Sequence, residues 1–507
     1  MPNALLVFVH GWSVTSTGTY GGLPARLKAE AAREGGPGID VAHVHLGQYV
    51  SFRNEVRIDD IARAFEAALG PVLADAGRGR RFACITHSTG GPVVREWLDR
   101  YYVRTGRLDD CPMSHLVMLA PANFGSALAQ LGKSRLGAMK AWFGGVEPGQ
   151  GVLDWLELAS PESLDLNLRW IRDYPALDLP SRARPVFPFV LSGDAIDRKL
   201  YDHVNAYTGE TGGDGVVRLA AANLNASHLV LAQPALVDGE SLPAARKRLR
   251  TLAKVSAHRA PATAFKIVPG VSHSGEAMGI LGSVANDGRP HPTVDAILRC
   301  LGVRDARGYA ALCREFDREN ADHQAPARRV EVEKVPVLPD RRYVHDPHAM
   351  VLFRLLDDSG TRVPEMNLLL TAGPSADPNQ LPQGFLTDRQ GNRRAPGNLC
   401  FFLNHAALAG CPAIRDGDRV VREALVPRPP YGLRLLPRQD EQLVEHWLAE
   451  LGADVASLLD LVRPNETTII DLRLTRVVRE GVFRFTRQLA PRKFRDDPPG
   501  GPVSGTP

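Results

Sequence analysis

One stretch of the chain, residues 81–94, is compatible with few folds. A short apolar run over 82–85 leads to Ser88, and Gly90, Gly91 and an amphipathic helical pattern follow at once. A strand that turns sharply into a helix lifts the side chain at the turn out of the sheet edge, and the turn closes only if the flanking residues are small. The positive end of the helix then faces whatever the serine attacks. The stretch predicts an exposed serine nucleophile; the alternative interpretation is a buried strand followed by a glycine-capped helix.

The first 300 residues alternate between apolar runs and helical patterns. The apolar runs predict strands over 4–9, 39–46, 81–85, 114–120, 186–191 and 264–268. Apolar residues at helical spacing separate several of these runs, as in 23–33 and 58–72. Alternation of this kind predicts a parallel sheet with helices on both faces.

The segment around the serine resembles a known motif. Residues 86–90, Thr-His-Ser-Thr-Gly, are similar to the Gly-x-Ser-x-Gly nucleophile elbow of the α/β-hydrolase family, with Thr86 in place of the first glycine. Residues 10–12 (His-Gly-Trp) and 121–126 (Pro-Ala-Asn-Phe-Gly-Ser) resemble segments of lipases in the family's order. The resemblance implies that Ser88 is the nucleophile and that the backbone N–H groups of Trp12 and Thr89 form an oxyanion hole. Losing one such donor typically lowers the rate by about 10²–10³.

The resemblance also implies the other two members of a catalytic triad. His273 lies on a glycine-containing loop after the last strand of the sheet, where this family keeps its general base. Asp214 lies in Gly-Gly-Asp-Gly-Val-Val, which is similar to the acid segment of bacterial lipases and related acyltransferases. Asp194, directly at a strand end, is the fallback acid. The order Ser, Asp, His is that of α/β-hydrolases. Three other histidines fit less well by position: His228, His258 and His291.

The region 125–185 does not continue the alternation of apolar runs and helical patterns. It is rich in leucine and holds three of the six tryptophans among glycine and proline breaks. An insertion at this point of the fold commonly forms a helical cap over the active site. Two interpretations stay open: the cap lines an acyl-chain pocket or touches a lipid surface, or it is an extra packed subdomain.

The chain changes character after residue 303, which ends the predicted catalytic domain, 1–303. Residues 304–345, with a charged helix over 308–318, predict a linker. Residues 346–489 predict a mainly-β, sandwich-like accessory domain. Its strands are expected over 349–356, 366–370, 399–403, 467–474 and 482–485, with one helix over 440–451. The predicted roles of this domain are substrate presentation, lipid-surface docking or partner binding. Residues 490–507 predict a disordered tail.

Composition excludes several classes of protein. The net charge of +4 comes without a basic block, so no nucleic-acid partner is expected. Six scattered cysteines argue against a disulfide scaffold and for synthesis in a reducing compartment, and a bond between Cys400 and Cys411 is not expected. No clustered ligands predict a metal, and serine chemistry needs no cofactor. No signal peptide or membrane-spanning run is found. A cytoplasmic location is expected, with export without a signal peptide as the alternative.

These observations predict an α/β-hydrolase fold with a helical cap, plus the β-rich domain. The predicted function is serine hydrolysis of lipid carboxylic esters, of the lipase or phospholipase A type, through an acyl-enzyme. The expected partners are a lipid or ester substrate and a membrane surface; a protein partner of the second domain stays unidentified. Alternatives are a small-ester esterase, an acyltransferase, or a non-catalytic binding protein with this fold. The architecture also resembles the lipase effectors without a signal peptide that bacteria inject into rivals.

Overall fold

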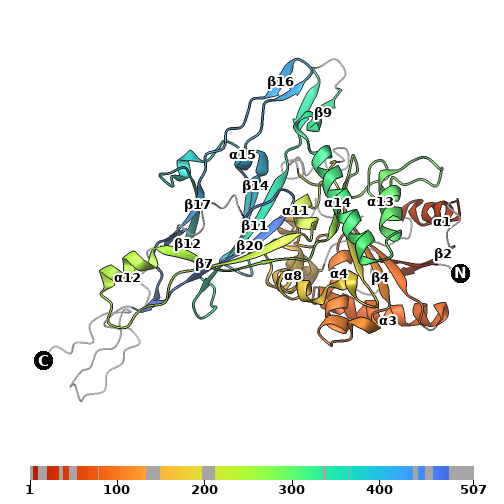
Figure 1. The fold of residues 1–507 in the computed structure, drawn as a ribbon, viewed down its shortest axis with the longest axis horizontal. Helices are drawn as coiled ribbons and strands as arrows, with labels where there is room; N and C mark the ends of the chain where they lie inside the picture. The colour runs from red at the N-terminus through yellow and green to blue at the C-terminus, as the bar shows by residue number, and fades with distance from the viewer. Residues whose placement is uncertain are drawn as a thin grey trace.

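The structure, a computed structural model, describes residues 4–9, 20–33, 38–44, 54–77, 79–132, 149–196, 212–334, 339–364, 366–437, 444–451 and 461–478. Among these residues, no helix combines the length and the apolar character needed to span a bilayer. Two large sheets lie beside each other (Figure 1).

The first sheet has six strands in the order β2-β1-β3-β4-β5-β8, and every neighbouring pair is parallel. The strands are β1 (Ala4–Val9), β2 (Ile39–Val44), β3 (Phe82–His87), β4 (Met113–Leu119), β5 (Phe187–Gly193) and β8 (Ala264–Val268). All six residues of β3 are buried, as expected for a central strand covered on both faces. The predicted fold class, a parallel sheet with helices on both faces, is confirmed.

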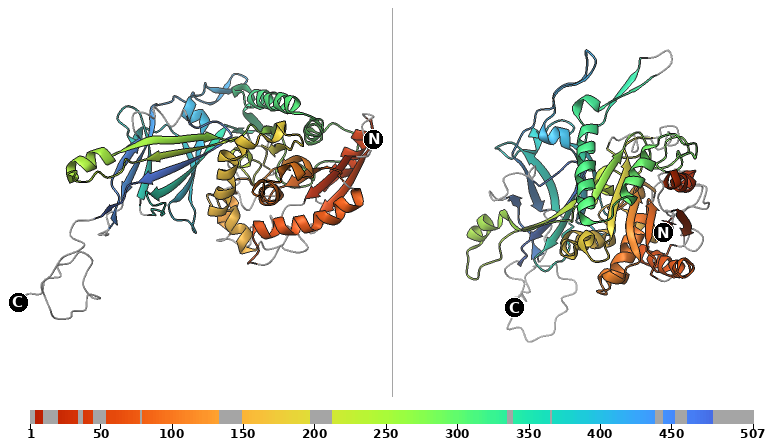
Figure 2. Two further views of the ribbon diagram at one scale, coloured as in Figure 1. Left: turned by 60° about the horizontal axis from the view of Figure 1, so that its bottom comes forward. Right: turned by 45° about the vertical axis from the view of Figure 1, so that its right-hand side comes forward.

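Successive residues of each strand enter two different cores. Val7 and Cys84 belong to the core under α3 and α4, whereas Phe8 and Ile85 belong to the core under α1, α13 and α14. The helices cover both faces of the sheet (Figure 2). Their bounds are α1 Leu23–Arg33, α3 Ile58–Ala76, α4 Gly90–Leu98, α13 Pro292–Leu301 and α14 Ala306–His323. Helix α4 continues as a π-helical turn over Asp99–Val103.

The described part of the insertion is helical and packs into the core under α3 and α4, the main core. Its helices are α5 (Ala127–Gly132), α7 (Gln150–Leu156) and α8 (Pro161–Arg172). The side chains of Trp155 and Trp170 are buried in the same cluster as the α4 side chains. The described part therefore supports the interpretation as a packed subdomain. Residues 133–148, which include Trp142, lie outside the described residues.

The second sheet has nine strands, in the order β12-β17-β19-β7-β6-β20-β11-β14-β13. Their bounds are β6 Ala226–Ala232, β7 Thr251–Arg259, β11 His348–Asp357, β12 Met366–Ala372, β13 Leu386–Gly391, β14 Asn398–Asn404, β17 Tyr431–Pro437, β19 Ala449–Leu451 and β20 Thr467–Leu474. The sheet curls so that Phe385 and Tyr431, beside its two edges, stack with their ring centroids 5.1 Å apart. It is mixed, not purely antiparallel as expected for a sandwich, because β20 runs parallel to both β6 and β11.

The smaller elements connect or extend the two sheets. Helices α11 (Leu219–Ala222), α12 (Leu242–Leu249) and α15 (His405–Ala409) are short. The hairpins β9–β10 and β15–β16 extend from one end of the molecule (Figure 1). Their strands are β9 Val330–Glu333, β10 Arg341–Val344, β15 Ile414–Asp416 and β16 Arg419–Arg422; β18 (Val444–Glu445) pairs with β21 (Val477–Val478).

The structure divides the chain differently from the predicted boundaries. Strands β6 and β7, which precede residue 303, belong to the second sheet. The range 304–345 contains α14, whose Phe316 is buried against the first sheet. The helix predicted over 440–451 is wrong in its described part, which forms β18 and β19. The predicted strand 482–485 and the predicted disordered tail 490–507 lie outside the described residues.

The two sheets share one core. On β11, Met350 and Leu352 lie in the main core, whereas Val351 and Phe353 lie in a separate core inside the second sheet. Alternation with period two is what a strand covered on both faces requires. One face of the second sheet is therefore part of the core of the first. All six cysteines are free and buried, so no bond joins Cys400 to Cys411.

Candidate active site

Ser88 lies at the sharp turn between β3 and α4. Its φ angle is +54°, in the left-handed region that non-glycine residues rarely adopt. Three backbone hydrogen bonds hold this turn: Ser88 N–H donates to the Leu119 carbonyl at 3.0 Å, and the Ser88 carbonyl accepts from Gly91 at 3.2 Å and Ala122 at 3.4 Å. Backbone strain of this kind persists only where the surroundings impose it, and it is common at functional sites.

Two neighbouring positions show why the turn needs small or buried residues. A Cβ atom on Gly91 would lie 2.8 Å from the Cβ of Pro121, closer than such atoms ever come. Thr86 stands where the elbow motif has glycine, and its side chain is fully buried. Its hydroxyl makes no hydrogen bond with any of the described residues. The threonine is therefore accommodated inside the sheet and leaves the turn intact.

His273 lies on the loop after β8 and contacts Ser88. Its Nε2 is 3.1 Å from Ser88 Oγ, and its Nδ1 is 2.9 Å from Asp214 Oδ2. An ionised carboxylate only accepts hydrogen bonds, so Nδ1 carries the proton and Nε2 is left as the acceptor for the serine hydroxyl. The backbone N–H of His273 also donates to the Asp214 carbonyl at 3.0 Å. These contacts join three residues that the sequence separates by 59 to 185 positions.

Asp214 is fully buried, and backbone donors orient its carboxylate. Oδ1 accepts the N–H groups of Val216 at 3.0 Å and Val217 at 2.8 Å, which leaves Oδ2 for His273. A tight loop over residues 212–218, the acid loop, makes this possible. Gly213 is essential to it, because a Cβ there would lie 2.5 Å from the Val217 carbonyl oxygen.

The fallback acid has a different partner. Asp194 Oδ2 lies 2.5 Å from His323 Nε2 on α14, and its Oδ1 accepts the N–H of Gly270 at 3.0 Å. It therefore joins α14 to the loop after β8, while Asp214 contacts His273.

The other histidines weighed by position have structural contacts. His228 Nε2 lies 3.1 Å from the buried Asp471, and the His228 and His258 rings stack with centroids 6.1 Å apart. The His291 side chain caps α13 by accepting the Thr293 N–H.

The structure describes one of the two expected oxyanion donors. Thr89 follows Ser88 directly and is the N-cap residue of α4, so its N–H lies at the positive end of that helix. Trp12 lies outside the described residues. Among the described residues, no group of three or more histidine, cysteine or carboxylate side chains is placed to hold a metal ion.

Two groups around the site were missed at the sequence level. His87 Nε2 lies 3.0 Å from the His273 carbonyl oxygen, so that nitrogen carries a proton and supports the loop of the base. Its position inside the elbow motif was the available signal. Ser126 Oγ donates to the Val216 carbonyl at 2.6 Å and supports the loop of the acid.

A buried arginine joins the helix of the nucleophile to the insertion. Arg95 on α4 donates to Asn123 Oδ1 at 3.1 Å and to Asn167 Oδ1 on α8 at 3.0 Å. Its guanidinium also lies over the Trp170 ring, 5.4 Å from the centroid. Burial lowers the pKa of Arg95 to about 10, which leaves it charged at neutral pH. Asn123 in turn donates to the Ala222 carbonyl of α11 at 2.7 Å, so the network reaches the element that follows the acid loop.

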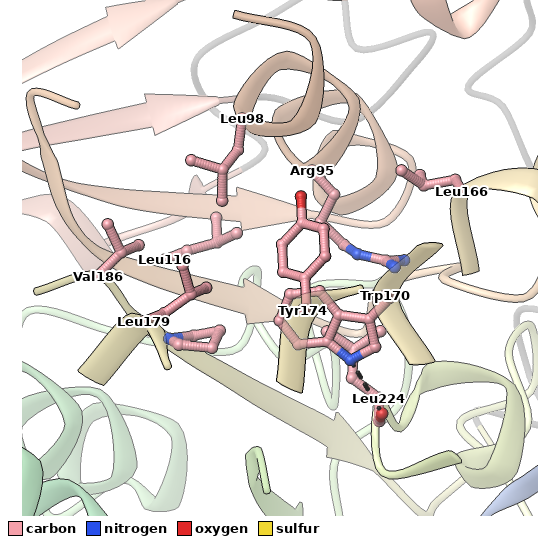
Figure 3. Close-up of a pocket in the computed structure, with 10 residues that line it drawn as sticks. Arg95, Leu98, Leu116, Leu166, Trp170, Tyr174, Leu179, Val186 and Leu224 are labelled. Atoms are coloured by element: carbon pink, nitrogen blue, oxygen red, sulfur yellow. Dashed lines mark hydrogen bonds between the residues drawn. The ribbon is translucent and has the colours of Figure 1, made fainter. Parts of the chain in front are cut away.

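The pocket beside Arg95 is too small for a substrate. Figure 3 shows it enclosed by apolar side chains of α4, α8, β4 and the segments around them. Its volume is about 10 Å³, roughly the space of one water molecule. This pocket is therefore not a substrate site.

No protein-family model matches the chain, and no curated protein sequence matches it significantly. Among solved structures, the phospholipase PlaB from Legionella pneumophila is 40% identical, covers 99% of both chains and superposes with a TM-score of 0.81. The same enzyme in complex with thio-NAD superposes with a TM-score of 0.80. The mature lipase BlEst2 from Bacillus licheniformis is 20% identical over 44% of this chain and 81% of its own, with a TM-score of 0.31.

Proposed function

Since this chain belongs to the lipase and phospholipase family of α/β-hydrolases that includes PlaB of Legionella pneumophila, we propose that it cleaves phospholipid carboxylic esters through Ser88, His273 and Asp214. The chain is a serine ester hydrolase that acts on lipids. The observation that carries the proposed roles is the pair of contacts made by His273, 3.1 Å to Ser88 Oγ and 2.9 Å to Asp214 Oδ2.

The first half of the proposed reaction forms the acyl-enzyme. His273 Nε2 takes the proton of Ser88 Oγ as that oxygen attacks the acyl carbonyl carbon. Asp214 stabilises the imidazolium that results, and the N–H groups of Thr89 and Trp12 bind the negative oxygen. The tetrahedral intermediate collapses, and protonated His273 gives its proton to the departing alcohol.

The second half returns the enzyme to its starting state. Water attacks the acyl-enzyme while Nε2 accepts one of its protons, and the proton then returns to Ser88 Oγ as the fatty acid leaves. An alcohol in place of water would give acyl transfer. Product analysis with an added alcohol distinguishes the two outcomes.

We propose that the lipid is taken from a membrane surface. The hairpin between β6 and β7 extends away from the first sheet and carries α12 (Figure 1). Its apolar side chains Leu236, Val237 and Leu242 are 44%, 58% and 47% exposed. Exposed apolar side chains grouped on a projecting element favour contact with another apolar surface.

A lipid panel tests the proposed function. Wild type and Ser88→Ala are assayed on phospholipid vesicles, emulsified triacylglycerol and a water-soluble nitrophenyl ester. The expected result is highest activity on phospholipid and, with all three substrates, a loss of at least about 10³-fold in Ser88→Ala. Ser114→Ala is the matched control, because Ser114 lies at the start of β4, at the opposite edge of the sheet from Ser88, and its hydroxyl contacts the Phe82 carbonyl at 3.0 Å and His115 Nδ1 at 2.9 Å. Retained activity in Ser88→Ala would exclude Ser88 as the nucleophile.

A further inference from the structure

The loop of the proposed acid lies where the two sheets meet. Asp214 is followed by α11 and, after three intervening residues, by β6, which is already a central strand of the second sheet, between β7 and β20. On the other side, Gly212 approaches β11 so closely that a Cβ atom would lie 2.8 Å from His348 Nδ1. The acid loop is thus bounded on both sides by the second sheet.

Arg218 makes the main side-chain contacts between this loop and the second sheet. Its Nη1 lies 3.3 Å from Asp388 Oδ2 on β13, and its guanidinium carbon lies 3.7 Å from the centroid of the Phe402 ring on β14. The side chains of Arg218 and Asp388 are only 11% and 10% exposed. Gln390 donates to the same Asp388 oxygen at 2.8 Å and helps to fix it. Ion pairs shielded from water in this way are screened much less than surface pairs.

Two backbone anchors support the same segment. Thr467 Oγ1 on β20 donates to the Ala220 carbonyl at 2.7 Å, and Asn223 Nδ2 donates to the Asn465 carbonyl at 2.8 Å. They hold α11, the helix for which Arg218 is the N-cap residue. The end of the acid loop is therefore attached to three strands of the second sheet.

Backbone hydrogen bonds link Arg218 to the segment that holds the carboxylate of Asp214. Arg218 pairs with Gly213 in an isolated β-bridge, and the Asp214 N–H donates to the Val217 carbonyl at 3.2 Å. Val217 also donates to Asp214 Oδ1. A displacement of Arg218 therefore moves a donor that orients the carboxylate.

From these contacts we infer that Arg218 is a positioning residue for the ester hydrolysis, and that the second sheet, through Asp388 and Phe402, fixes the carboxylate of Asp214 toward His273. This inference rests on the proposed function, because it assumes that Asp214 is the acid of the triad. It assigns the β-rich domain a part in catalysis at the first sheet.

The test uses the full chain and three substitutions. Arg218→Met removes the charge but keeps an apolar chain over Phe402, Arg218→Lys keeps the charge, and Asp388→Asn removes only the partner carboxylate. The control is Arg394→Met, because Arg394 also joins the second sheet to the first part of the chain, pairing with Asp154 at 3.2 Å and with Glu162 on α8. That control interface lies at α7 and α8 and does not include the acid loop.

The readouts are kcat and KM on the water-soluble ester, and the rate of labelling of Ser88 by a fluorophosphonate. Arg218→Met and Asp388→Asn are expected to lower kcat on the order of 10- to 100-fold with KM within about twofold of wild type, because misplacement of about 1 Å can cost that much. Arg218→Lys is expected to recover part of the loss. Arg394→Met is expected to keep kcat within about twofold of wild type, since it leaves the acid loop in place.

A double substitution separates positioning from a general effect on the fold. In an Asp214→Asn background, Arg218→Met should lower the labelling rate by no more than about twofold, because the carboxylate that it positions is already lost. If Arg218→Met lowered the labelling rate in that background by the same factor as in the otherwise wild-type chain, this result would overturn the inference. So would wild-type kcat in Asp388→Asn, which decides the question if Arg218→Met does not fold. If Asp214→Asn keeps full activity, the proposed triad itself is wrong; if Asp214→Asn is inactive and the Arg218 and Asp388 variants are not, only the positioning role is wrong.

Discussion

The backbone of Ser88 has a φ of +54°, and three backbone hydrogen bonds hold it in that conformation. Holding a non-glycine residue there costs on the order of 1–3 kcal/mol, which the surrounding packing must offset. Gly91 is part of that packing, since it lets α4 approach Pro121. The position of the Ser88 hydroxyl therefore depends on Gly91, three residues further along the chain.

Substitution of Gly91 tests this dependence. Gly91→Ala should lower the free energy of unfolding by about 1–3 kcal/mol, as overpacking does, and should reduce kcat because the turn at Ser88 must shift. Gly70→Ala in α3 is the control, because no atom lies within 4 Å of a Cβ there. It should leave activity unchanged and raise stability by up to about 1 kcal/mol. Urea unfolding and ester kinetics of the two variants check the prediction, and equal effects would contradict it.

At the level of single residues, the sequence predicted which side chains lie together in the site, but it did not predict the contacts that position them. Ser88, His273 and Asp214 were found through local motifs, and choosing Asp214 over Asp194 agrees with the contacts of each carboxylate. Their catalytic roles stay predictions. Asp388 could not be found in this way, because it lies 170 positions from Arg218 and carries no local motif.

At the scale of elements, strand β14 shows how the two sheets share their side chains. Phe402 belongs to the core shared with the first sheet and lies under Arg218, whereas Phe401 belongs to the separate core of the second sheet. Both rings are at least 98% buried. The two phenylalanines are therefore matched in size and burial, and they differ in the core that each one packs into.

This pair gives a prediction for the element. Phe401→Leu and Phe402→Leu should each lower stability by a similar amount, about 1–2 kcal/mol, because each loses part of a buried ring. Only Phe402→Leu should also lower kcat, since it removes the surface on which Arg218 rests. Thermal unfolding and ester kinetics measured on both variants decide this. A loss of kcat in Phe401→Leu as large as in Phe402→Leu would count against it.

Element prediction succeeded where local pattern decides structure. The predicted strands 4–9, 264–268 and 467–474 match β1, β8 and β20 to the residue. It failed over 444–451, the described part of a predicted helix, where pairing of β18 with β21 and of β19 with β17 overrides a helical pattern. The placement of β6 depended on β20, more than 200 residues later, which no local pattern could indicate.

At the scale of the whole molecule, buried histidines make stability depend on pH. Burial lowers the pKa of His115 and the pKa of His348 to about 4, against an ordinary value near 6.5. His115 lies between the first sheet and α13, and His348 lies beside the acid loop. Both stay neutral in the folded chain at pH 5, whereas the unfolded chain protonates them.

Stability should therefore fall as the pH drops from 7 to 5, because the unfolded state binds more protons over that range. The expected loss is about 2 kcal/mol for each of the two histidines. His115→Gln keeps a donor for the Val303 carbonyl but cannot take up a proton. The free energy of unfolding that this variant loses between pH 7 and pH 5 should therefore be smaller than the wild-type loss by about 2 kcal/mol. Urea unfolding of both proteins at pH 7 and pH 5 measures the difference. An identical pH dependence would show that His115 does not contribute.

The central claim is that Ser88 Oγ, activated by His273, forms the covalent bond to the acyl group. Mass spectrometry of the protein after reaction with a fluorophosphonate tests it most directly. One adduct is expected, located at Ser88 by fragmentation of its peptide, with labelling at least about 100-fold slower in His273→Ala. An adduct on another serine, or labelling of Ser88 at the same rate without His273, would contradict the account.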